Sequence, residues 1–117
     1  MKKYDVLIVG SGSAGMTAAL YASRKKLKTG IISIDIGGQT LLTDNIENYP
    51  GFESISGPEL MSKFRAHAEK FGAETIMGKA QEIKKVKNLF SIKLSNDEEY
   101  SGKTIILASG KTARQLG

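Results

Sequence analysis

Three glycines with the spacing of a dinucleotide-binding turn lie near the start of the chain, at Gly10, Gly12 and Gly15. They follow the apolar run at residues 6–9 and lead into small and apolar residues that are typical of a helix packed on a sheet. Glycine at these positions permits a tight strand-to-helix turn, close approach of the backbone to a pyrophosphate, and close packing of the helix on the strand. The helix N–H groups and dipole would then face the pyrophosphate. We predict dinucleotide binding here; the alternative is a purely structural glycine turn.

Asp35 is a second residue with a predicted role in binding a dinucleotide. Residues 29–34 are predicted to form a second strand, parallel to the first because a helix joins the two. Asp35 follows this strand, 20 residues beyond Gly15, where an acid in dinucleotide-binding folds accepts hydrogen bonds from the adenosine ribose. Its carboxylate would repel a 2′-phosphate, which predicts binding of FAD or NAD and not of NADP. The competing interpretation is a surface turn aspartate.

A long connection begins at Gly37 and runs to about Ser56. Segments of this length without regular structure inside a compact domain are usually functional. Gly37 and Gly38 admit a ligand close to the backbone, while Gln39 and Asn48 offer amide donors and acceptors. We therefore predict that this connection contributes to the binding site.

The remaining elements must position these residues. Ser56 and Glu59 have capping-box spacing, and apolar residues at intervals of three and four then predict an amphipathic helix that ends near Gly72. Strand-like runs follow, of which the middle three alternate as in an antiparallel meander and the last is a buried run. They cover residues 73–77, 79–86, 89–94, a short piece around Tyr100, and residues 103–109. The expected fold class is α/β, a Rossmann-like parallel sheet with helices plus an appended antiparallel β-meander.

The composition restricts the functions that remain. With 117 residues, 40% hydrophobic and 25% charged, the chain has room for one compact domain. The net charge of +5 is concentrated at residues 24–28, the predicted end of a helix, without interleaved aromatic residues, so we interpret this cluster as a solvated helix end and not as a nucleic-acid contact. The chain has no cysteine, which excludes a thiolate metal site and a redox dithiol within these residues. His67 is expected at the surface, and we predict no metal site and no catalytic acid, base or nucleophile.

The apolar runs and the N-terminus bear on location. No apolar run approaches the roughly 20 residues needed to span a bilayer. Residues 1–3 lead directly into a predicted strand, without the apolar region and cleavage site of a signal peptide. We therefore expect a cytoplasmic protein.

Three motifs follow one another along the chain, namely the glycine-rich stretch, Gly37-Gly38-Gln39, and Glu-Asn-Tyr-Pro-Gly at residues 47–51. Taken in this order, they resemble the FAD domain of thioredoxin reductases and of the closely similar flavoprotein that reduces bacterial peroxiredoxin. The likeness covers essentially all 117 residues, including Ser-Gly-Pro-Glu-Leu at 56–60, Lys-Phe-Gly-Ala-Glu at 70–74 and Ile-Ile-Leu-Ala-Ser-Gly at 105–110. The chain departs from the family at Ser13, where proline is common, and at Ser109, where threonine is common.

The resemblance implies that the cofactor is FAD and assigns residues to it. The FAD pyrophosphate would lie over Gly10, Ser11, Gly12, Ser13, Ala14 and Gly15, and its ribose near Asp35. The ribityl chain and isoalloxazine ring would run alongside Gly37, Gly38, Gln39 and Asn48. Ala80 would meet the adenine through its backbone, and the segment Ala108, Ser109 and Gly110 would close over the cofactor.

Family members continue through an inserted NADPH domain that carries a Cys-x-x-Cys pair, and then return to complete the FAD domain. We therefore expect residues 1–117 to be the N-terminal segment of an FAD-binding domain whose closing segment and NADPH domain lie outside it. The full-length protein would pass hydride from NADPH to FAD and then to a thioredoxin-like or peroxiredoxin-like protein disulfide. It would act as a homodimer, without nucleic-acid or membrane partners. Two alternatives remain, namely part of a thioredoxin-reductase-like ferredoxin–NADP reductase, and a free-standing FAD- or NAD-binding module without turnover.

Overall fold

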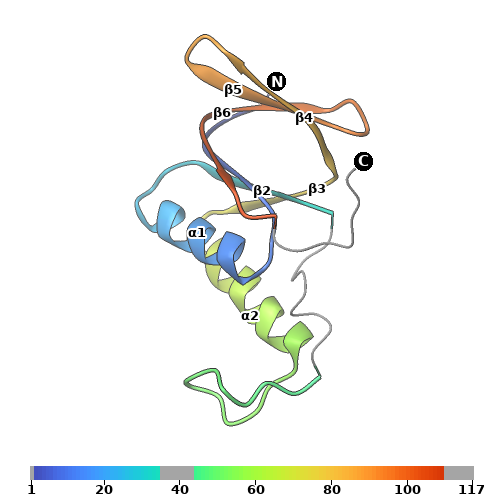
Figure 1. The fold of residues 1–117 in the computed structure, drawn as a ribbon. Helices are drawn as coiled ribbons and strands as arrows, with labels where there is room; N and C mark the ends of the chain where they lie inside the picture. The colour runs from blue at the N-terminus through green and yellow to red at the C-terminus, as the bar shows by residue number, and fades with distance from the viewer. Residues whose placement is uncertain (1, 35–43, 110–117) are drawn as a thin grey trace.

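A computed structural model describes residues 2–34 and 44–109 of the chain. These residues form a six-stranded sheet in the order β3-β2-β1-β6-β5-β4, together with two helices. The strands are β1 (Lys2–Val9), β2 (Thr29–Ser33), β3 (Glu74–Met77), β4 (Ala80–Val86), β5 (Leu89–Leu94) and β6 (Glu99–Leu107), and the helices are α1 (Ser13–Arg24) and α2 (Gly57–Lys70) (Figure 1). The predicted α/β class, with a parallel sheet and an antiparallel addition, is confirmed.

The parallel half of the sheet is built around β1. It pairs in parallel with β2 on one side and with β6 on the other, so that Val6 lies opposite both Thr29 and Thr104. β3 extends this half as a parallel partner of β2. All five residues of β2 are buried, as expected of an interior parallel strand that is covered on both faces. The strand ends at Ser33, one residue earlier than predicted, and Ile34 is exposed.

The sheet separates two apolar layers because successive side chains of a strand point to opposite faces. Val6 and Ile8 of β1 pack with Ile31, Met16 and the end of α2 in a cluster on the helix face. Leu7 points to the other face, where Ile92 and Leu94 of β5 cover it. Tyr4 joins Leu7 there because the alternation of β1 is interrupted at Asp5 and Val6, whose N–H groups both donate to the Lys28 carbonyl. The meander therefore curls over the parallel sheet opposite to the helices (Figure 1).

The antiparallel half differs from the prediction in one element. The short piece around Tyr100 and the run at 103–109 form a single strand, β6, that is parallel to β1 along its length. Only the first part of β6, from Glu99 to Gly102, is also paired with β5, in antiparallel orientation. Beyond Gly102, no described strand pairs with the side of β6 that faces away from β1. The prediction of a buried run is wrong for Ile106 and Leu107, which are 39% and 67% exposed. At these two residues β6 pairs with β1, and its pairing with β5 has ended at Gly102.

The helix ends behave largely as the sequence predicts. Ser56 caps α2, its Oγ accepting from the Glu59 N–H at 3.2 Å, and the Glu59 side chain meets the same hydroxyl instead of the backbone N–H of a full capping box. The basic residues 24–28 are exposed at the end of α1, and His67 is exposed on α2, where its ring lies 5.8 Å from the Phe71 ring. Among the described residues, neither helix has the length and apolar character to cross a membrane.

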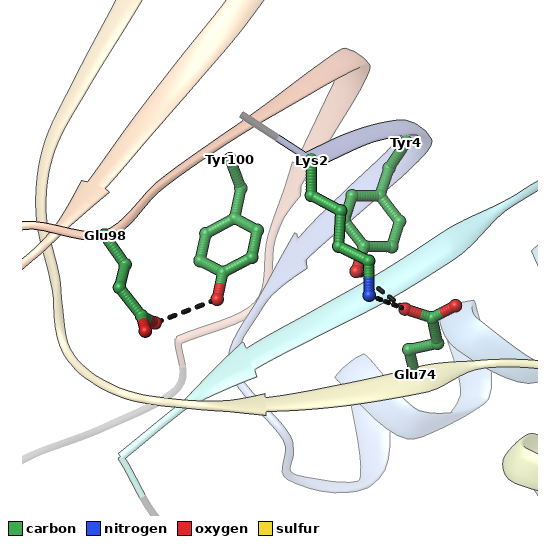
Figure 2. A network of polar contacts seen from close by, with 5 residues as sticks. All are labelled: Lys2, Tyr4, Glu74, Glu98 and Tyr100. Carbon is green, nitrogen blue, oxygen red and sulfur yellow. Dashed lines mark hydrogen bonds and ion pairs between the residues drawn. The ribbon is translucent and has the colours of Figure 1, made fainter.

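A polar network ties β1 to β3 across β2 at the end of the sheet opposite to the glycine turn. The Tyr4 hydroxyl donates to Glu74 Oε1 at 2.7 Å, and Lys2 Nζ lies 3.2 Å from the same oxygen (Figure 2). The Tyr4 ring passes over β2 at Gly30, where a Cβ would lie 3.0 Å from the ring. Because Gly30 has no side chain, it leaves room for the Tyr4 ring to cross β2 and reach Glu74.

This network makes the free energy of unfolding depend on pH in the acidic range. The Tyr4 hydrogen bond, with a smaller effect of Lys2, lowers the pKa of Glu74, while burial and Glu74 raise the pKa of Tyr4 far above its usual range. A folded-state pKa below the unfolded value stabilises the fold above the unfolded pKa of about 4.3, and this stability is lost as the pH falls through the folded pKa. We expect Tyr4→Phe to flatten the fall in free energy of unfolding below about pH 5.

Urea unfolding from pH 7 down to pH 3 measures that slope. Tyr100→Phe is the matched control, because it deletes a hydroxyl that bonds Glu98 and leaves Glu74 untouched (Figure 2). Identical acid dependence in the two variants would contradict a stabilising contact between Tyr4 and Glu74.

Candidate functional site

The glycine-rich turn lies at the carboxyl end of β1, where two backbone segments meet so closely that no side chain fits. Gly10 has φ +111°, and a Cβ there would lie 2.0 Å from the carbonyl oxygen of Ala108. A Cβ on Gly15 would lie 2.0 Å from the carbonyl oxygen of Gly10. Both glycines are therefore required by close packing of backbone on backbone, at the end of the strand and at the start of α1.

Among residues 2–34 and 44–109, no side chain caps the N-terminus of α1. Gly12 is the N-cap and offers no side-chain acceptor, and the first turn carries no acid. Ser13 and Ala14 in that turn are exposed. α2 differs, because Ser56 caps it and Glu59 lies in its first turn. An uncapped, exposed helix N-terminus behind a glycine turn fits an anionic group such as a pyrophosphate.

Ser33 belongs to this site and was missed from the sequence. It ends β2 and is 8% exposed, and its Oγ lies 2.5 Å from the Oγ of Ser11 in the glycine turn. The Ser11 side chain is thus engaged with the end of β2. The only signal in the sequence was a hydroxyl at a strand end, two positions before the predicted Asp35.

Ala108 and Ser109, which are predicted to close over the cofactor, follow β6 and lie against the glycine turn. The Ala108 N–H donates to the Val9 carbonyl at 2.8 Å, and Ser109 Cα would lie 2.9 Å from a Cβ on Gly10. Ala80 opens β4, two residues beyond Gly78, whose N–H donates to the Ser33 carbonyl at 2.9 Å. The ends of β1, β2 and β6 and the β3–β4 connection therefore meet at one edge of the sheet.

Asn48 does not join this group in the described structure. It is exposed in residues 44–55, a segment that Ile46 and Ile55 pair into a small loop beyond the N-terminal end of α2 (Figure 1). Tyr49 holds the loop to α2, its ring 5.7 Å from the Phe64 ring.

The other predicted ligand-binding positions lie outside the described residues. They are Asp35, Gly37, Gly38, Gln39 and Gly110.

The chain is similar in sequence to proteins of known function. Residues 4–117 match the family described as pyridine nucleotide-disulphide oxidoreductase, so the chain belongs to that family. It is 47% identical to a thioredoxin reductase of Bacillus subtilis, over 99% of this chain and 37% of that protein. It is 45% identical to a thioredoxin reductase of Listeria monocytogenes, over 99% of this chain and 36% of that protein.

The fold of this chain is also similar to those of solved thioredoxin reductases. Thioredoxin reductase from Streptococcus pyogenes superposes with a TM-score of 0.89 at 47% identity, over 98% of this chain and 38% of that chain. The enzyme from Gloeobacter violaceus gives 0.91 at 30% identity, over 100% of this chain and 40% of that chain. The Rossmann-like FAD-binding fold and the resemblance to thioredoxin reductases are confirmed, and the chain spans less than half the length of these relatives.

Proposed function

We propose that this chain binds FAD as the N-terminal segment of the FAD-binding domain of a thioredoxin-reductase-like flavoprotein. The proposal is carried by the N-terminus of α1, which no described side chain caps and which begins three residues after backbone-packed Gly10, with Gly15 in its first turn. FAD presents a pyrophosphate to such a site, whereas a purely structural turn has no need for an exposed, acid-free helix start. When bound, FAD supplies hydride transfer, which no side chain of this chain can perform.

The roles of individual residues follow from this arrangement. The backbone N–H groups of Gly12, Ser13 and Ala14 hold the pyrophosphate, with Gly10, Ser11 and Gly15 shaping the turn. Ala108 and Ser109 close one side, and Ala80 lies near the adenine. Asp35 on the ribose, Gly37, Gly38, Gln39 and Asn48 along the flavin, and Gly110 remain predictions from the resemblance.

The exposed end of β6 supports completion of the domain by a further segment. Ile106 and Leu107 are exposed, and the β6 edge beyond Gly102 has no partner strand in the described ranges. An apolar strand with an open edge next to a cofactor site is normally paired or covered. In the full-length protein, NADPH would act through its own domain, and the electron acceptor would be a thioredoxin-like or peroxiredoxin-like disulfide. The full-length protein would be a homodimer and would act in the cytoplasm.

Titration of the chain with FAD tests the function, and Gly12→Asp provides the sharpest variant. Aspartate is a good N-cap and Gly12 has φ −73°, so the variant should keep or raise the melting temperature of the cofactor-free chain. Its carboxylate should nevertheless weaken FAD binding by about tenfold or more, because it occupies the N–H groups and repels the pyrophosphate.

Isothermal titration with FAD and NADP measures both effects. Asn88→Asp is the matched control, since it adds the same charge with little change of shape at an exposed position in the turn between β4 and β5. Binding of NADP in preference to FAD, or equal FAD affinity in the two aspartate variants, would refute an FAD pyrophosphate site at α1.

A further inference from the structure

Ser11 and Ser33 form a buried hydroxyl pair between the glycine turn and the sheet. Ser11 is 3% exposed and Ser33 is 8% exposed, and their Oγ atoms lie 2.5 Å apart. Burying a hydroxyl is unfavourable unless it is hydrogen-bonded, so the pair holds its geometry firmly. The turn around Ser11 is otherwise glycine at positions 10 and 12, and glycine leaves the backbone with maximal freedom. Among residues 10–12, only Ser11 has a side chain through which the sheet can restrain the segment.

Ser33 is itself held from the side of β3. It lies opposite Met77 in the parallel register, and its carbonyl accepts from the Gly78 N–H at 2.9 Å. The preceding carbonyl, that of Ile32, accepts from the Gly10 N–H at 2.8 Å. One member of the hydroxyl pair thus lies on a hydrogen-bonded strand of the sheet, and the other lies in the glycine turn.

We propose that Ser33 is a positioning residue of the pyrophosphate site and acts through Ser11. By holding the Ser11 side chain on β2, Ser33 orients the backbone N–H groups that follow it, those of Gly12 and Ser13, before a ligand arrives. Preorganised donors bind an anion better because no ordering is required on binding. This role rests on the FAD site proposed above.

A double-mutant cycle on the 117-residue chain tests the assignment. We expect Ser33→Ala to weaken FAD and ADP by the same factor, about 3- to 10-fold, since both carry the pyrophosphate and the adenosine. Ser11→Ala should give the same loss, and the double variant should lose no more than either single one, because the two residues act as one unit. Ser23→Ala is the control, a buried hydroxyl on α1 without a hydrogen-bond partner in the described structure.

Hydrogen exchange on the cofactor-free chain provides a readout that does not depend on binding. Ser33→Ala should accelerate exchange in a peptide over residues 10–16, at least threefold more than in a peptide from β5, whereas Ser23→Ala should not. Failure of the wild-type chain to bind either FAD or ADP would refute the proposed function, and exchange would still decide whether Ser33 orders the turn. Unchanged exchange, additive losses in the cycle, or a loss for FAD but not ADP would overturn the positioning role.

Discussion

Gly10→Ala is expected to destabilise the fold by about 2–5 kcal/mol. Two costs add at this position. The φ of +111° disfavours any L-residue, by roughly 1–2 kcal/mol, and the new Cβ would lie 2.0 Å from the Ala108 carbonyl oxygen. Relieving that overlap means separating β1 from the segment after β6, which adds about 1–3 kcal/mol. Urea unfolding at neutral pH measures the change, and FAD titration should report a parallel loss of affinity.

Gly72→Ala separates the two costs. Gly72 has a similar φ of +106°, but a Cβ there meets nothing within 4 Å. This variant should carry only the backbone cost of roughly 1–2 kcal/mol and keep its affinity for FAD. Equal destabilisation by the two substitutions would mean that the contact with Ala108 contributes nothing beyond the turn.

The second large effect concerns turnover. We expect the 117-residue chain, even when saturated with FAD, to show no NADPH-dependent reduction of a disulfide substrate. A dithiol relay needs two cysteines and the chain has none, and the one dinucleotide turn that it contains is assigned to FAD. A longer protein that adds an NADPH domain with a Cys-x-x-Cys pair, together with the further segment proposed to cover the exposed end of β6, should show this activity.

Oxidation of NADPH in the presence of a protein disulfide is the measurement, with the same concentration of free FAD as the background. Gly12→Asp serves as the internal control, since any residual rate that depends on the FAD site should disappear with it. If the 117-residue chain oxidised NADPH steadily and faster than free FAD does, disulfide reduction would not require parts of a longer protein, and the prediction would be contradicted.

The local features of the site were predictable from the sequence because they depend on neighbouring residues. A run of apolar residues followed by Gly10, Gly12 and Gly15 is a strand, a turn and a helix start within ten positions. The Ser56 cap has the same origin, since its partner Glu59 lies one helical turn away. The antiparallel β4–β5 hairpin follows from alternation and the short turn between the two strands. Such patterns are dictated by backbone geometry and by the period of burial.

Tertiary structure alone decided which distant segments meet, because a pattern of burial does not name its partner. The Ala108 backbone is the neighbour that makes glycine obligatory at position 10, across 98 residues of chain. Tyr4 reaches Glu74 only because β2 lies between their strands and has Gly30 at the crossing. β6 is one strand and not two, since pairing with β1 continues where pairing with β5 stops. Ser33 meets Ser11 because parallel strands end at the same edge of the sheet, which brings the end of β2 to the glycine turn.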